Sequence, residues 1–363
     1  MQAQDFIPTP SLETIETGKV TWQSPSNIAL VKYWGKKENQ IPANPSISFT
    51  LNNCKTITSL EFALKNDSEA KRDFFDFDFY FEGQKKEEFK PKIYTFFERI
   101  EKYCPYLKNF QLIIKSENTF PHSSGIASSA SGMSALALCV MSMEKYLYPT
   151  ISEDYFYKKA SFLARLGSGS ACRSVKGKLV VWGEHAHING SSNLYGVEYP
   201  DAIHEIFENY QDTILLVDKG EKKVSSSIGH NLMHNHPFAE ERFRQAHNNL
   251  DTLKEIFKSG DVHKFIEIVE SEALTLHAMM MSSNPYFILM KPNTLEIINK
   301  IWAFREDTGL PVCFTLDAGA NVHVLYPENN KKEIFQFIED KLLAYCEKNQ
   351  FISDSIGLGS KLL

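Results

Sequence analysis

The chain has 363 residues, of which 43% are hydrophobic and 23% are charged, and its formal net charge is −6. That length exceeds what one compact core usually serves, so two domains are expected. No run of 18 or more apolar residues predicts a membrane span, and no long basic tract favours nucleic acid as a partner. Any site for an anion must therefore be built locally.

The start of the chain and the cysteines indicate the compartment. The first 16 residues lack the basic and apolar regions of a secretory signal, so a cytoplasmic location is expected. The six cysteines contain no CxxC pair, a pattern typical of reduced thiols rather than disulfides or a zinc knuckle. They are Cys54, Cys104, Cys139, Cys172, Cys313 and Cys346.

The N-terminal half is predicted to begin with sheet and to continue with helices. Its predicted elements are a polar arm over 1–20, strands at Lys55–Phe62 and Phe74–Phe81, helices at Ser128–Leu147 and Glu153–Leu166, and a strand at Lys178–Trp182. Apolar residues recur at helical spacing in the first helix, and Ser152 is suited to cap the second. A serine-rich loop therefore runs straight into a helix.

A change of pattern after Tyr195 predicts a second domain. Its predicted elements are a strand at Thr213–Asp218, a helical tract at Phe238–Met281 interrupted at Ser259-Gly260, a helix at Leu295–Asp307, strands at Pro311–Leu316 and Val322–Tyr326, and a helix at Lys331–Asn349. We expect the domains to cover residues 1–200 and 201–363.

Four polar stretches could carry chemistry, and each also has a structural interpretation. PHSSGIASSASG (Pro121–Gly132) could bind phosphate or form a plain loop-to-helix turn, and it lacks the lysine of a Walker loop. GSGSACRS (Gly167–Ser174) could end a helix or bind an oxyanion through its arginine. In the structural interpretation, the lysines of SPSNIALVKYWGKK (Ser24–Lys37) are solvated surface charges. The aspartate of LDAGANVH (Leu316–His323) then accepts hydrogen bonds from the backbone of a turn.

Together these stretches resemble the diphosphomevalonate decarboxylase family of the GHMP kinase superfamily. The family's NIAxxKYWGK block corresponds to Asn27–Lys36, its PxxxGLASSAxG loop to Pro121–Gly132, and its FTxDAGxNVHxL block to Phe314–Leu325. GSGSACRS matches without change, and WGEHxxIxGSSxLYG is visible over 182–196. The blocks span nearly the whole chain in the expected order.

The resemblance implies an α+β GHMP kinase fold. The N-terminal domain would resemble domain 2 of ribosomal protein S5, the C-terminal domain would be ferredoxin-like, and the active site would lie between them. It also implies ATP-dependent conversion of (R)-5-diphosphomevalonate to isopentenyl diphosphate, ADP, phosphate and CO2 in the mevalonate pathway. ATP with Mg²⁺ and a homodimer are expected on the same ground.

The resemblance also assigns roles to residues. Asp317 would orient the C3 hydroxyl and accept its proton, Lys32 would neutralise charge, and Arg173 would fix the anionic groups of the substrate. Further substrate contacts are expected at Ala29, Tyr33, Lys36, Ser168, Gly169, Ser170 and Ser226. ATP contacts are expected at Ser123, Gly125, Ala127, Ser128, Ser129 and Ser131.

Some residues depart from the family pattern or invite other interpretations. His230 stands where the VSSxxGM block has methionine, and Ser123 and Ser124 replace alanines of the phosphate loop. The spacing of the histidines near 185–187 and 230–247 has no matching glutamate or cysteine, so no dedicated metal site is predicted. The competing functions are a mevalonate 3-kinase, a phosphomevalonate decarboxylase and a catalytically silent nucleotide-binding relative.

Overall fold

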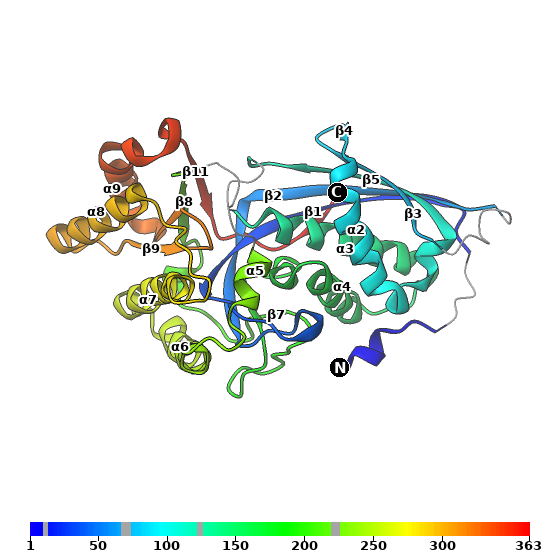
Figure 1. Ribbon diagram of the computed structural model, residues 1–363, viewed down its shortest axis with the longest axis horizontal. Helices are drawn as coiled ribbons and strands as arrows, with labels where there is room; N and C mark the ends of the chain where they lie inside the picture. Colours follow the sequence, from blue (N-terminus) through cyan, green and yellow to red (C-terminus); the bar gives the residue numbers. More distant parts are fainter. Residues whose placement is uncertain (10–13, 67–73, 122–125, 219–225) are drawn as a thin grey trace.

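A computed structural model describes residues 1–9, 14–66, 74–121, 126–218 and 226–363, without the side chains of 226 and 227. It contains two β-sheets, each covered by helices, in an α+β arrangement (Figure 1). The first sheet is built mainly from the N-terminal half and the second from the C-terminal half.

The larger sheet is mixed, because β3 and β5 pair in parallel while its other neighbours are antiparallel. Its strand order is β12-β1-β2-β5-β3-β4, and β6 pairs with β2 and β7 away from this path. The strands are β1 (Thr17–Val31), β2 (Ser46–Leu64), β3 (Asp76–Phe81), β4 (Gln84–Lys85), β5 (Phe110–Asn118), β6 (Leu179–Trp182), β7 (Val197–Glu198) and β12 (Lys361–Leu362).

Three helices cover one face of this sheet (Figure 1). They are α2 (Lys90–Ile100), α3 (Ser128–Leu147) and α4 (Glu153–Gly167). Buried residues line nearly the whole length of α3, including Ala135, Leu138 and Met141, which are fully buried. The helix is therefore a core element, and its N-terminal residues are held in a fixed position at the end of the sheet.

The smaller sheet has the strand order β11-β8-β10-β9 with antiparallel neighbours throughout. Its strands are β8 (Gln211–Leu215), β9 (Cys313–Leu316), β10 (Val322–Tyr326) and β11 (Phe351–Ser355). The helices of this half are α5 (Ser226–Asn231), α6 (Ala239–Ser259), α7 (Val262–Met281), α8 (Pro292–Thr308) and α9 (Lys331–Phe337). The succession of strand, helices, two strands, helix and strand is the ferredoxin-like pattern.

The C-terminal segment ties the two halves together. The carboxylate of Asp354 in β11 accepts hydrogen bonds from the backbone N–H groups of Asn52, Asn53 and Cys54 in β2. Beyond β11, the chain returns to the first sheet, where β12 pairs with β1. These contacts fix the position of the second sheet against the first, and so fix the cleft between them.

Most predicted elements are confirmed, and two predictions are wrong. The predicted arm over 1–20 instead contains a 3₁₀ turn at Ala3–Phe6, with Phe6 fully buried against Phe162, and β1 already begins at Thr17. The helix predicted to reach Asn349 ends as α9 at Phe337 and continues as π and 3₁₀ turns. An amphipathic pattern does not distinguish these closely related helix types.

The cysteine prediction is confirmed, because all six cysteines are free and buried. Within the described residues, no helix combines the length and the apolar composition needed to cross a bilayer. The helical tract of the second half breaks where expected, since Gly260 ends α6 in the left-handed conformation, with φ +78°.

Candidate active site between the two sheets

Lys32 and Asp317 meet where one strand of each sheet ends. Lys32 directly follows β1 and Asp317 directly follows β9, and the two residues are 285 positions apart in sequence. The Nζ atom of Lys32 lies 3.2 Å from Oδ1 of Asp317. The lysine side chain is only 2% exposed, whereas the aspartate side chain is 30% exposed. The carboxylate can therefore reach a ligand while its ammonium partner stays shielded from water.

Burial dominates the electrostatics of Lys32. It lowers the pKa of the ammonium, and the nearby Arg173 lowers it further, whereas Asp317 and Glu272 raise it. The charged form of Lys32 therefore depends on the Asp317 carboxylate beside it.

Arg173 is a buried cation near this pair. It lies in the 3₁₀ turn η6 (Gly169–Ser174), and its guanidinium donates to Asn27 Oδ1 at 3.3 Å and to the Ser46 hydroxyl. Burial lowers its pKa, while the negative charge of Asp317 raises it. No carboxylate lies within salt-bridge distance of Arg173 among the residues that the structure describes. Its charge is thus available to an anionic ligand.

Tyr33 packs closely against the GSGSACRS segment. A Cβ atom added to Gly169 would lie 2.9 Å from the Tyr33 hydroxyl, so any larger residue would displace the tyrosine. The Tyr33 ring also contacts Trp182, with a centroid distance of 4.6 Å. Ser168 and Ser170 flank Gly169 and are both partly exposed. These residues therefore form one wall of the site.

His230 fills the other side of Tyr33. Its ring lies 4.1 Å from the Tyr33 ring, and its Nδ1 atom accepts a hydrogen bond from the Gly35 N–H. Burial, with smaller contributions from Lys36 and Arg173, lowers the pKa of His230 to about 3. The ring is therefore neutral and carries its proton on Nε2. A histidine at this position acts as a packing and hydrogen-bonding group.

The serine-rich loop leads into α3 next to these residues. Ser123 and Gly125 lie outside the described residues, whereas Ala127 is the left-handed cap (φ 45°) of α3. Ser129 is exposed, and its hydroxyl lies 3.4 Å from the hydroxyl of Ser168. This contact joins the two loops that the sequence singles out.

The remaining predicted site residues differ in accessibility. Ser128 is partly exposed, but the Ser131 hydroxyl is buried and hydrogen-bonded to Thr56 and to the Ser128 carbonyl. Ala29 is buried in β1, where it pairs with Ser48. Ser226 is the first residue of α5, and its side chain is outside the described set.

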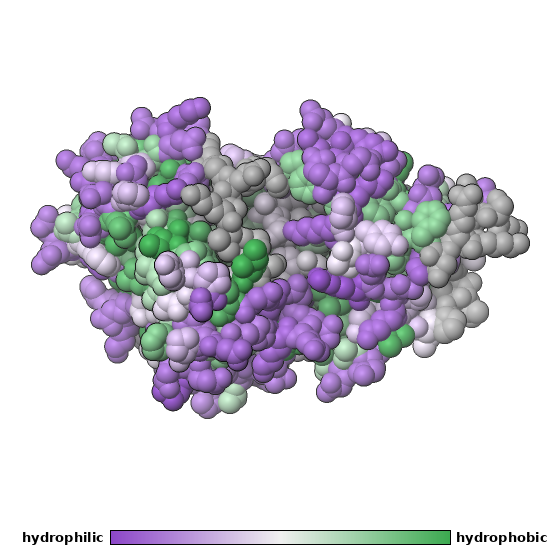
Figure 2. Space-filling view, in the orientation of Figure 1, coloured by the Kyte–Doolittle hydropathy of each residue, from purple (hydrophilic) through white to green (hydrophobic). Residues whose placement is uncertain are grey.

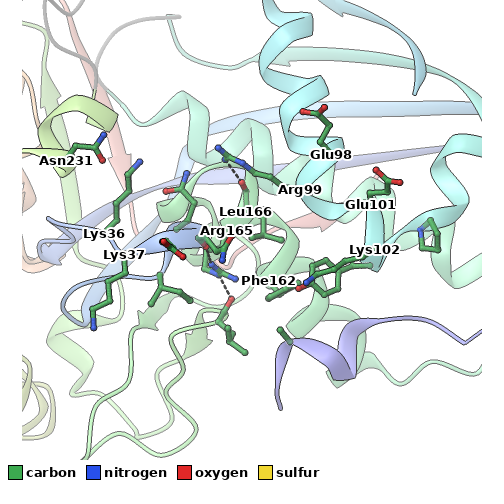
Figure 3. Close-up of a pocket in the computed structure, with 18 of the residues that line it drawn as sticks. Lys36, Lys37, Glu98, Arg99, Glu101, Lys102, Phe162, Arg165, Leu166 and Asn231 are labelled. Carbon is green, nitrogen blue, oxygen red and sulfur yellow. Dashed lines mark hydrogen bonds between the residues drawn. The ribbon is translucent and has the colours of Figure 1, made fainter. Parts of the chain in front are cut away.

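A large cleft lies beside Lys36, four residues after Lys32 (Figure 3). It has a volume of about 1160 Å³, and its lining includes five basic side chains, Lys36, Lys37, Arg99, Lys102 and Arg165. Lys36 extends toward Asn231, away from Lys37, and Arg99 donates to the Leu166 carbonyl at 2.9 Å. Burial and the charge of Arg99 lower the pKa of Lys36. The two cations thus lie close enough to repel each other.

A smaller pocket of about 240 Å³ adjoins the N-terminus of α3. Ser128, Ser129 and Gly132 lie on its helix side, and the rings of Phe79, Phe81 and Phe89 contribute to its apolar wall. Ser116, Asn118 and Lys92 add polar groups. The pocket combines flat apolar surface with hydrogen-bonding groups beside a helix N-terminus, an arrangement suited to a base attached to phosphates.

One histidine cluster comes together away from the site. His185, His187 and Asp251 have ligand atoms within 4.8 Å of one another, and His187 Nδ1 lies 2.6 Å from Asp251 Oδ1. However, His185 Nδ1 accepts the His187 N–H, so its Nε2 carries a proton and faces the His247 carbonyl. These hydrogen bonds favour a contact between segments over a metal centre.

Three residues around the Lys32–Asp317 pair were not anticipated from the sequence. Glu272 accepts the Lys32 N–H at 2.9 Å, Arg242 donates to the Lys32 carbonyl at 3.2 Å, and His277 Nε2 lies 3.1 Å from the Asp317 carbonyl oxygen. The available signal was a charged residue on an apolar helix stripe, since Glu272 lies between Val269 and Leu276 at helical spacing.

Two family models match nearly all of the chain. The diphosphomevalonate decarboxylase-like N-terminal domain matches residues 24–193, and the mevalonate 5-diphosphate decarboxylase C-terminal domain matches residues 213–359. The crystal structure of mevalonate diphosphate decarboxylase from Staphylococcus aureus is 31% identical, covers 98% of this chain and 100% of its own, and has a TM-score of 0.79. The chain belongs to the diphosphomevalonate decarboxylase family.

Other members of this family give the same result. The diphosphomevalonate decarboxylase of Saccharomyces cerevisiae is 28% identical over 338 residues, covering 90% of this chain and 81% of the yeast protein. The Enterococcus faecalis mevalonate diphosphate decarboxylase is 26% identical, with a TM-score of 0.79 and coverage of 96% and 99%. The GHMP fold and diphosphomevalonate decarboxylase activity are thus established for this chain, as an ATP-binding enzyme of the mevalonate pathway.

Proposed function

We propose that the cleft converts (R)-5-diphosphomevalonate and ATP to isopentenyl diphosphate, ADP, phosphate and CO2, with Lys32, Arg173 and Asp317 as the catalytic residues. The observation that carries this assignment is the accessible Asp317 carboxylate paired with the buried Lys32 ammonium at 3.2 Å. A carboxylate in this setting can accept a proton from an alcohol while the ammonium keeps it ionised.

The first step is phosphoryl transfer to the C3 hydroxyl of the substrate. The hydroxyl oxygen bonds to the γ-phosphorus, its proton passes to Asp317, and the bond from the γ-phosphorus to ADP breaks. Lys32 balances the negative charge that gathers around the carboxylate and the transferring group. This step depends on positioning and charge neutralisation, and the 3.2 Å contact between the Lys32 ammonium and the Asp317 carboxylate supports both.

The second step releases phosphate and CO2. The C3–O bond breaks with its electrons on the phosphate, and the electrons of the bond to the neighbouring carboxylate form the new double bond as CO2 departs. Arg173 is placed to hold an anionic group of the substrate, because its charge has no carboxylate partner among the described side chains. A closed site must keep water away from C3 at this stage.

Several hydrogen-bond donors lie near one another where the diphosphate group of the substrate would bind. We assign it to Tyr33, Lys36 and the Ser168–Ser170 segment, with Ala29 and Ser226 as further contacts from the family resemblance. The mutual repulsion of Lys36 and Arg99 supports this assignment, because a polyanion between them would relieve it. A monophosphate carries less negative charge, so it would relieve the repulsion between Lys36 and Arg99 less.

ATP is assigned to the N-terminus of α3 and the adjoining small pocket. One solved relative, described as MDDEF in complex with MVAPP, AMPPCP and magnesium, has a TM-score of 0.80 and is 27% identical. In this chain Ala127, Ser128 and Ser129 would face the phosphates, and the 240 Å³ pocket would take the adenine. The family resemblance adds Ser123 and Gly125, which lie outside the described residues, and Ser131, whose buried hydroxyl would support the loop through the Ser128 carbonyl. Mg²⁺, when bound, neutralises phosphate charge, and a serine hydroxyl is a suitable oxygen ligand for it.

The test is a substrate comparison with the purified chain. Incubation with ATP and (R)-5-diphosphomevalonate labelled at the carboxylate should yield labelled CO2 together with ADP in equal amounts. ADP without CO2 would favour a 3-kinase, and faster turnover of the monophosphate would favour a phosphomevalonate decarboxylase. Absence of both products would favour a silent nucleotide-binding relative.

We also propose a homodimer, as the family resemblance implies. The change of sequence pattern after Tyr195 supports domains at 1–200 and 201–363. The six free, buried cysteines support a reducing compartment such as the cytoplasm. Figure 2 shows apolar residues gathered on the face over the C-terminal half. Among the large apolar side chains of this half, Tyr286 and Ile288 are 77% and 67% exposed. Such exposed apolar surface is a common feature of subunit interfaces. Sedimentation equilibrium would test the dimer, and a monomer at all concentrations would contradict it.

A further inference from the structure

A buried ion pair lies behind Lys32 on the C-terminal side of the cleft. Arg242 of α6 donates to Glu272 of α7 through two nitrogens, one of them 3.0 Å from Oε1, and both side chains are 0% exposed. Asn249 donates to the same Oε1 atom at 2.6 Å. The Glu272 carboxylate is therefore fixed by three hydrogen bonds before it contacts Lys32.

The Arg242–Glu272 pair binds both backbone groups of Lys32, its N–H and its carbonyl. Glu272 Oε2 accepts the Lys32 N–H at 2.9 Å, and Arg242 donates to the Lys32 carbonyl at 3.2 Å. Asn44 also donates to that carbonyl, at 2.9 Å. Lys32 has left the β1 ladder at this point, so these side chains replace the strand partners of its backbone.

The same helix holds the main chain of Asp317. His277 is five residues after Glu272 on α7, is 1% exposed, and contacts the Asp317 carbonyl through Nε2 at 3.1 Å. Burial lowers the pKa of His277 to about 4, so the ring is neutral near pH 7. Since a carbonyl oxygen can only accept, the proton of the neutral ring lies on Nε2.

We propose that α7 positions the catalytic ion pair, with Glu272 and Arg242 fixing Lys32 and His277 fixing Asp317. This inference rests on the proposed roles of Lys32 and Asp317. The three residues contact the main chains of Lys32 and Asp317, and so act as positioning residues. Helix α7, together with Arg242 of α6, then determines the separation of an ammonium and a carboxylate that come from different sheets.

The Arg242–Glu272 pair contributes more to the orientation of Lys32 than to the stability of the fold. A buried Arg–Glu pair costs so much desolvation that apolar residues of similar volume are often equally stable in its place. Apolar residues cannot, however, accept the Lys32 N–H or donate to its carbonyl. A displacement of about 1 Å at a reacting group can cost roughly 100-fold in rate. Removing the pair should therefore affect catalysis more than folding.

The test is the double variant Arg242→Met/Glu272→Leu. We expect it to fold, with a kcat for CO2 release lowered about 10- to 100-fold, while the KM values for ATP and diphosphomevalonate change by less than about 3-fold. The acid limb of the kcat profile should move to higher pH, because a displaced ammonium stabilises the Asp317 carboxylate less. His277→Leu should lower kcat in the same way, and His277→Gln, which keeps an N–H donor, should restore much of it.

The matched control lies on the same helix. Glu270 of α7 pairs with Arg305 of α8, with Nη1 2.7 Å from Oε1, and neither contacts Lys32 or Asp317. The variant Arg305→Met/Glu270→Leu should keep the kcat and the pH profile of the parent. An equal loss in both double variants would identify the effect as general damage to α7 and overturn the proposal. Unchanged kcat in Arg242→Met/Glu272→Leu would also overturn it.

A crystal structure of the double variant separates this proposal from the proposed function. The Nζ–Oδ1 distance should exceed the 3.2 Å of the parent chain, and an unchanged distance would refute the positioning role. That outcome does not depend on activity. Failure of the parent enzyme to release CO2 would instead refute the proposed function. Should the double variant not fold, the same distance and kcat are measured in His277→Leu, which loses the donor to the Asp317 carbonyl and should show the same changes.

Discussion

Replacing His230 by methionine should make the folded enzyme less sensitive to acid. His230 is 8% exposed, and its pKa falls from 6.5 to about 3 on folding, chiefly through burial. Protons therefore bind more tightly to the unfolded chain than to the folded one. The stabilisation from this neutral ring is complete above pH 6.5 and is lost as the pH falls toward 3.

The size of the effect follows from these pKa values. A pH of about 5 is roughly 1.5 units below 6.5, the pKa of His230 in the unfolded chain, so the unfolded ring is mostly protonated there. The folded ring, with a pKa of about 3, remains mostly neutral. Each unit is worth about 1.4 kcal/mol, so acidification from about pH 7.5 to about pH 5 removes about 2 kcal/mol through His230 alone. Methionine cannot titrate, so the variant should lose about 2 kcal/mol less than the parent over the same interval.

Urea unfolding of both proteins at the two pH values measures this difference. The lost hydrogen bond from Gly35 affects His230→Met equally at both pH values, so it cancels in the comparison. The titration of His277 is common to both proteins and cancels too. Equal losses in parent and variant would show that His230 is not held neutral, and would refute the reasoning about its environment.

Three further substitutions test other parts of the structure. Asp317→Ala should lower kcat by about 10²- to 10⁴-fold while ATP binding, followed by a fluorescent analogue, stays close to that of the parent; full activity would exclude Asp317 as the proton acceptor. Ser129→Ala should raise the KM for ATP, and an unchanged value would remove Ser129 from the nucleotide site. Lys159→Met removes the ammonium that lies 2.7 Å from the buried Glu144 carboxylate, so the free energy of unfolding should fall by about 3–5 kcal/mol. A fall of less than about 1 kcal/mol would contradict this interpretation of the pair.

Elements with a clear local periodicity were predicted well from the sequence, and elements without one were not. The helix at Ser128–Leu147 has the predicted bounds, because apolar residues at helical spacing follow a loop of small residues. The strand predicted at Lys55–Phe62 is only part of β2, which begins at Ser46. Its first residues are buried polar and apolar side chains packed between the sheets, so the alternation that marks a half-exposed strand is missing there.

The proposed catalytic residues could be singled out from motifs, but the residues that hold their main chains could not. Lys32, Arg173 and Asp317 lie in short blocks of unusual composition, and the structure places them close together. Glu272 and His277 lie within an ordinary helical pattern, where a charged or polar residue normally indicates the exposed face. Glu272 does lie on an apolar stripe of α7, but the stripe alone does not show what covers it. Both side chains become buried only when α7 packs against the ends of β1 and β9, which is a tertiary event.

The proposed mechanism requires the Asp317 carboxylate to face the C3 hydroxyl of the substrate. A crystal structure with (R)-5-diphosphomevalonate, Mg²⁺ and a non-hydrolysable ATP analogue would measure this contact. We predict that the C3 oxygen lies within about 2.6–3.2 Å of an Asp317 carboxylate oxygen, with the γ-phosphorus in line on the other side. A substrate bound with its C3 hydroxyl directed away from Asp317 would contradict it.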